Sequence, residues 1–106
     1  MALTRDFRET IGERAGRDPE FRVALLTQAL SLLFDGDVTT GRNILATYIN
    51  GTLGYQSLGE KLGTHPKSLM RMLGPKGNPR ANNLFAIIRE LQLHEGVRFD
   101  VTPVRE

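Results

Sequence analysis

The chain contains no cysteine among its 106 residues. This absence excludes a disulfide scaffold, a thiolate metal site and a cysteine nucleophile. Long apolar runs are also missing, since the longest spans only residues 84–88 (LFAII) and a membrane-spanning helix needs about 20 such residues. Residues 1–12 carry four charged side chains and no apolar signal-peptide core. We therefore expect a cytoplasmic protein without a membrane partner.

The residues that are present have the composition of one globular domain. Apolar residues make up 40% of the sequence and charged residues 25%, both near the averages of folded proteins. Folding of a chain of this length removes roughly two-thirds of its surface from water, which is enough for a core without cross-links. We expect residues 1–106 to form a single domain.

Positive charge is concentrated in the middle of the chain. Residues 54–83 carry five cationic side chains against Glu60 alone, a net charge of +4. Residues 1–53 hold six Arg against seven acids and residues 84–106 three Arg against four acids, so each flank sums to −1. A basic middle favours a surface that faces an anion, with nucleic acid as the first choice.

Apolar residues recur at helical spacing through most of the chain, and we predict an all-α protein. Long helices are expected within residues 4–16, 18–35 and 37–54. Thr4 is the expected cap of the first, and the Asp18-Pro19 pair is a strong start signal for the second because Asp accepts first-turn amides and Pro tolerates the N1 position.

The elements become shorter after Gly54. Residues 55–62 and 66–73 are predicted short helices, joined by a tight turn at 63–65 and followed by a loop at 74–79 with Asn78 as a candidate cap. A last helix ends at Gly96. Apolar and polar residues then alternate, which predicts a short strand over residues 97–103 that pairs with another chain or lies against the domain.

Residues 55–73 match the requirements of a helix-turn-helix. Two helices that cross steeply need a small residue at the crossing, which Gly59 supplies, and the turn needs a residue that accepts a left-handed backbone, which Gly63 supplies. Apolar residues stand at the offsets expected to face inward. These residues are Leu58, Leu62, Leu69 and Met72.

Residues 58–91 resemble the lambda-repressor/Cro-like (Xre-type) DNA-binding domain through Leu58-Gly59, Leu62-Gly63 and Asn78-Pro79. The whole chain resembles the HigA-like antitoxins of addiction modules, most closely in the run from Lys67 to Pro79 (KSLMRMLGPKGNP). The pattern differs at Thr64 and at His65, where a capping Ser is usual.

The resemblance implies a type II antitoxin that binds operator DNA, neutralises a RelE/ParE-like toxin and represses its own operon. Residues 37–96 then form the helix-turn-helix unit, residues 1–36 are the candidate toxin-binding part, and the strand at 97–103 or the last helix is the candidate homodimer contact. A dimer is expected because one recognition helix gives weak specificity.

Candidate DNA contacts follow from the side of the second short helix that faces away from the core. Lys67, Ser68 and Arg71 are predicted to read base edges, since Arg and Lys donate to guanine O6 and N7 and Ser contacts several bases. Polar residues at the start of the first short helix and in the segment after the second are predicted to contact the DNA backbone. They are Gln56, Lys76, Asn78 and Arg80.

Other functions remain open at this stage. A stand-alone Xre-type repressor without a toxin and a protein-interaction module that does not use DNA both fit the sequence. An enzyme is disfavoured, because the two histidines stand far apart, no cysteine completes a metal set and no serine has a nucleophile-elbow pattern. We expect no metal and no cofactor.

Overall fold

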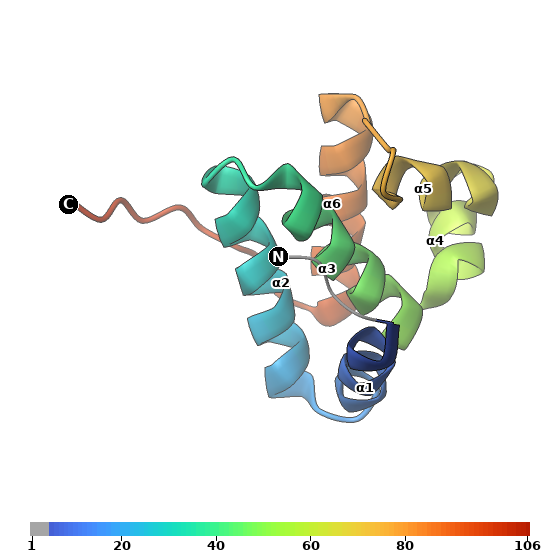
Figure 1. Cartoon of the computed structure of the whole chain (residues 1–106), viewed down its shortest axis with the longest axis horizontal. Coiled ribbons are helices and arrows are strands. Elements are labelled where there is room, and N and C mark those ends of the chain that lie inside the picture. Colours follow the sequence, from blue (N-terminus) through green and yellow to red (C-terminus); the bar gives the residue numbers. More distant parts are fainter. Residues whose placement is uncertain (1–4) are drawn as a thin grey trace.

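The computed structural model describes residues 5–106, and in this range the chain forms helices and no strand. The predicted all-α class is therefore confirmed. The expected cap Thr4 lies outside the described residues. The helices are α1 (Arg5–Ala15), α2 (Pro19–Phe34), α3 (Val38–Gly51), α4 (Gly54–Leu62), α5 (Pro66–Leu73) and α6 (Ala81–Glu95) (Figure 1).

Two aspartates fix where the long helices begin. Asp18 Oδ1 accepts a hydrogen bond from the Phe21 amide at 3.1 Å, with Pro19 as the first helical residue, and Asp37 Oδ1 accepts from the Thr40 amide at 3.2 Å. These backbone amides favour the charged carboxylates, so the pKa of each aspartate lies below its ordinary value. The start that Asp18-Pro19 predicted for α2 is confirmed.

Helix α3 is the centre of the molecule, because α1, α2, α4 and α5 all contact it. Figure 1 shows it crossing the middle, with α2 on one side and α4 and α5 on the other. Its inward stripe of Leu45, Tyr48 and Ile49 is fully buried. Helix α2 approaches closely at Gly41, where a Cβ would lie 2.8 Å from the Leu33 side chain and 3.2 Å from the Ala29 carbonyl oxygen.

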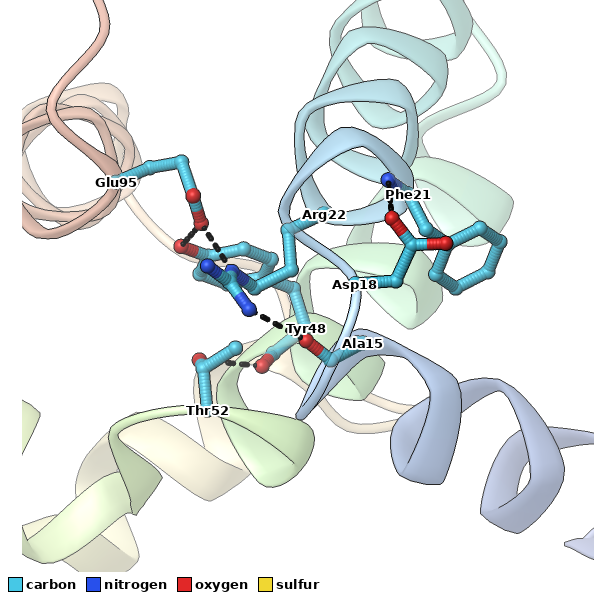
Figure 2. A network of polar contacts seen from close by, with 7 residues as sticks. All are labelled: Ala15, Asp18, Phe21, Arg22, Tyr48, Thr52 and Glu95. Carbon is cyan, nitrogen blue, oxygen red and sulfur yellow. Dashed lines mark hydrogen bonds and ion pairs between the residues drawn. The ribbon is translucent and has the colours of Figure 1, made fainter.

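A buried polar network joins α2, α3 and α6. Glu95 Oε1 accepts from Arg22 Nε at 2.8 Å and from the Tyr48 hydroxyl at 2.7 Å, and Arg22 Nη1 donates to the Ala15 carbonyl oxygen at 3.0 Å (Figure 2). The Glu95 side chain is only 6% exposed. Burial, and secondly the bond to Glu95, raise the pKa of Tyr48 well above its ordinary value. The network fixes the end of α6 against the N-terminal helices.

The predicted strand at residues 97–103 is wrong, because these residues have no regular secondary structure. A strand needs a partner for its backbone hydrogen bonds, and no other described segment is extended alongside it. The Phe99 amide instead donates to Gln92 Oε1 at 2.8 Å, and Phe99 lies over an apolar pocket lined by side chains of α2, α3 and α6. The segment then leads away from the body (Figure 1).

Across residues 5–106, none of the helices has both the length and the apolar character that crossing a bilayer requires.

Candidate nucleic-acid interface

Two glycines shape the junction between α4 and α5 as the sequence predicted. A Cβ on Gly59 would lie 2.5 Å from the Thr64 carbonyl oxygen and 3.4 Å from the Pro66 ring, so the helices meet at a distance that only glycine allows. Gly63 ends α4 in the left-handed region with φ 65° and ψ 33°, which glycine adopts without strain. Together they let α5 fold back across α4 after three residues.

His65 is the N-cap of α5. Its backbone is extended, and its Nδ1 accepts a hydrogen bond from the Lys67 amide at 3.2 Å. Pro66 is the first residue of the helix, where its missing N–H has no partner to lose. With histidine at the position where the sequence motifs predicted a capping Ser, α5 therefore still has a capped start.

The inward residues of α4 and α5 attach both helices to the core. Leu58 and Leu69 are buried, whereas Leu62 and Met72 are half-buried and pack against the core. Leu73, which was not among the predicted inward residues, is also buried. The four predicted inward positions are thus correct, and α5 places one more side chain, Leu73, in the core than predicted.

The opposite side of α5 presents polar groups to solvent. Lys67 and Arg71 are exposed and Ser68 is half-buried. Within residues 5–106, neither cation forms an ion pair, since the ion pairs found there join Arg14, Arg22 and Arg98 to other partners. Both charges are therefore available to an anion. Met70, on the same helix, is 49% exposed.

The loop after α5 extends this basic surface. Lys76, Asn78 and Arg80 are all exposed, and the two cations have no ion pair in the described part of the chain. Arg71 and Lys76 line one open groove together with Met70, Gly74, Pro75 and Gly77. The structure therefore brings a predicted base reader and a predicted backbone contact side by side.

Asn78 is not the cap of α6, contrary to the prediction. The helix begins at Ala81, its N-cap is Arg80, and that residue makes no capping side-chain hydrogen bond. Asn78 lies two residues too early to reach the first-turn amides. Its side chain is left in the exposed loop, among the predicted backbone contacts.

Gln56 stands apart from the other predicted contacts. It lies in the first turn of α4, at the opposite end from the junction with α5, and its Nε2 is 3.5 Å from Glu60 Oε1. The N-cap of α4 is Leu53, which has no side-chain acceptor. The first amides of α4 therefore have no capping side chain, which suits contact with a phosphate. Next to Gln56, burial raises the pKa of Tyr55 to about 12.

One residue that supports this surface was not among those predicted from the sequence. Arg42, on α3, is 6% exposed, and its Nη1 donates to the carbonyl oxygens of Met72 at 3.2 Å, Gly74 at 3.1 Å and Gly77. The available signal was its spacing: Arg42 shares the inward stripe of α3 with Leu45 and Ile49 at i+3 and i+7.

No group of three or more His, Cys, Asp and Glu side chains that could hold a metal ion occurs in the described range. No protein-family model, curated protein or solved structure matches this chain. The similarity to HigA-like antitoxins and to the Xre-type domain therefore rests on the quoted sequence motifs, and it stays a prediction.

Proposed function

We propose that this chain is a sequence-specific DNA-binding antitoxin that represses its own operon and neutralises a RelE/ParE-type toxin. In this proposal α4 and α5 are the helix-turn-helix of a lambda-repressor/Cro-like domain within residues 37–96, and α5 is the recognition helix. The observation that carries the DNA-binding part is the outward side of α5, where Lys67 and Arg71 are exposed and, within residues 5–106, without ion pairs.

The two groups of polar residues have different roles in this proposal. Lys67, Ser68 and Arg71 contact base edges in the major groove, which is wide enough for an α-helix and distinguishes all four base pairs. Phosphate contacts position the protein on the duplex without reading its sequence. We assign them to Gln56, Lys76, Asn78 and Arg80.

The active form in this proposal is a homodimer that reads two half-sites about one helical turn apart. The dimer contact is assigned to α6. Phe85 and Leu93 are 60% and 61% exposed on this helix, with Arg89 halfway between them. Residues four apart lie along one side of a helix, so the three form a single accessible stripe.

The toxin contact is assigned to the N-terminal helices within residues 1–36. Helix α2 turns Leu25, Leu26 and Ala29 to the core and leaves Thr27 and Gln28 exposed. Its outward side can therefore be covered by a partner without disturbing the core. The toxin class itself comes from the sequence motifs.

DNA binding is tested by mobility-shift titration with the DNA upstream of the gene at several salt concentrations. We expect Arg71→Ala to lose about 1–3 kcal/mol of discrimination between the upstream DNA and a scrambled duplex. We expect Lys76→Ala to weaken binding to both duplexes alike and to reduce the salt slope by about 1. Arg17→Ala is the matched control, since Arg17 is an exposed, unpaired arginine in the α1–α2 turn. If Arg71→Ala and Lys76→Ala leave binding to every duplex unchanged, the assignment of α5 is wrong.

The toxin part has a separate test. The chain is co-expressed with the product of the adjacent reading frame and purified through one of the two. Co-purification of a small toxic partner, together with rescue of growth, supports the antitoxin. DNA binding without such a partner identifies a stand-alone repressor, and a partner without DNA binding identifies a protein-interaction module.

A further inference from the structure

Arg42 reaches the far end of α5 from the neighbouring helix α3. Its Nη1 carries two N–H groups, which three carbonyl oxygens share: Met72 in the last turn of α5, and Gly74 and Gly77 in the loop. The last carbonyls of a helix lack internal partners and form the negative end of its dipole, so a guanidinium is well suited to this place.

Within residues 5–106, Arg42 supplies the hydrogen bonds between the loop and a neighbouring helix. The hydrogen bonds of residues 75–79 are the bond from the Gly77 amide to the Gly74 carbonyl oxygen, at 2.9 Å, and the bond from Arg42 to the Gly77 carbonyl oxygen. The first is internal to the turn, so among the described residues only the Arg42 side chain links the loop to another helix by hydrogen bonds. Gly77 is also pressed against the end of α5, because a Cβ there would overlap the Met72 carbonyl oxygen.

Burial of the Arg42 guanidinium against the end of α5 costs free energy, because a charged group is removed from water. The side chain is buried, its Nε has no hydrogen-bond partner, and no carboxylate within the described residues pairs with it. An apolar side chain would fill the same space without the desolvation of a charge. What an apolar side chain could not do is bind three carbonyl oxygens from two segments at once.

We infer that Arg42 is a positioning residue of the DNA interface: it holds the loop that carries Lys76 against α5, so that Lys76 and Arg80 meet the phosphates beside the bases that α5 reads. Arg42 itself touches no DNA. This inference rests on the proposed function, because it concerns the geometry of the same surface.

The test measures the salt dependence of binding to a fluorescent random-sequence 24-base-pair duplex, by anisotropy, for the full chain. The Arg42→Met variant keeps the length of the side chain and removes the charge and the donors. We expect it to stay helical by circular dichroism and to lose about 1–2 from the slope of log K against log salt, as the phosphate contacts of the loop are lost. We expect Arg42→Lys to recover part of the slope, since its ammonium has three N–H groups on a shorter stem.

Arg22→Met is the matched control, because Arg22 is a partly buried arginine whose partners, Glu95 and Ala15, lie away from α5. We expect it to lower the melting temperature and leave the salt slope unchanged. If Arg42→Met is unfolded, Arg42→Gln carries the test, because its shorter, uncharged side chain cannot donate to three carbonyl oxygens, and a wild-type slope with Gln overturns the inference. A folded Arg42→Met with the wild-type slope also overturns it. Failure of the wild-type chain to bind this duplex or its upstream DNA contradicts the proposed function instead.

Discussion

At the scale of single residues, the α4–α5 junction makes two different demands on glycine. Gly63 needs conformational freedom, since its φ is positive and the space around its missing Cβ is open. Gly59 needs space, since the backbone oxygen of Thr64 would lie 2.5 Å from a Cβ. Substitution by alanine therefore tests the backbone conformation at Gly63 and the space available for a Cβ at Gly59.

We expect Gly59→Ala to lower the free energy of unfolding by about 2–3 kcal/mol, because a backbone oxygen cannot move aside without separating the helices. Gly63→Ala adds only the cost of a left-handed alanine, about 1 kcal/mol. Urea unfolding followed by circular dichroism measures both values. Gly36→Ala is the control, because Gly36 also has a positive φ of +89° and open space around it but lies outside α4 and α5. A smaller loss for Gly59→Ala than for Gly36→Ala would show that the junction is not tightly packed.

At the scale of helices, the aspartate caps link stability to pH. The pKa of Asp18 and that of Asp37 are lowered in the folded chain, chiefly by the amides of Phe21 and Thr40. Because the pKa is lowered in the folded state, the charged carboxylate contributes its full stabilisation above the ordinary aspartate pKa of 3.8. This contribution is lost as the pH falls through the lowered pKa of the folded state.

We therefore expect the melting temperature to decrease when the pH is lowered below about 4. The decrease should be smaller in Asp18→Asn, because the asparagine side chain keeps a hydrogen-bond acceptor but is not protonated in this pH range. Thermal unfolding by circular dichroism between neutral and acidic pH measures the difference. Asp35→Asn is the matched control, since the Asp35 side chain is exposed and makes no hydrogen bond within the described residues. Equal pH profiles for Asp18→Asn and wild type would contradict the link.

Most helix ends, though not the start of α6 at the predicted cap Asn78, were predictable because caps act locally. Asp18, Asp37, Gly63 and Gly96 each stand at a helix end for a reason visible within a few residues. The segment after Gly96 shows the limit of such reasoning. Its alternating exposure at residues 97–100 is real, but a strand also needs a partner that alternation cannot supply.

The candidate interface was predictable only in part, for a related reason. The exposure of Lys67 and Arg71 follows from the inward positions of Leu69 and Met72 on the same helix, so it could be read from spacing. The contact between Arg42 and the loop joins residues more than thirty positions apart. Its spacing with Leu45 and Ile49 placed Arg42 on the inward side of α3, but an arginine within a helix is ordinarily solvated, and the packing of α3 against α5 decides that this one is buried.

At the scale of the whole molecule, Glu95 connects segments far apart in sequence through Arg22 and Tyr48. We expect Glu95→Ala to lower the free energy of unfolding by about 2–3 kcal/mol, since it leaves a partly buried guanidinium and a buried hydroxyl without their acceptor. Tyr48→Phe removes one of the two bonds and costs about 1–2 kcal/mol. Urea unfolding measures both values.

The double variant Glu95→Ala with Tyr48→Phe is expected to lose less free energy of unfolding than the two single variants together, because each single variant already lacks the hydrogen bond between Tyr48 and Glu95. The exposed pair Arg98–Asp100 provides the control, and Arg98→Ala is expected to cost under about 0.5 kcal/mol. Strict additivity would mean that the carboxylate and the hydroxyl contribute independently.

The close fit of α2 against α3 bears on how the two proposed activities can be separated. A fragment starting at Asp37 would lack Leu25, Leu26 and Ala29, which belong to the common core. The apolar surface of α3 would then be exposed to water, and the fragment would aggregate or unfold. Truncation is therefore a poor way to obtain a DNA-binding piece free of toxin contacts, and single substitutions at Thr27 or Gln28 on the outside of α2 are the better route.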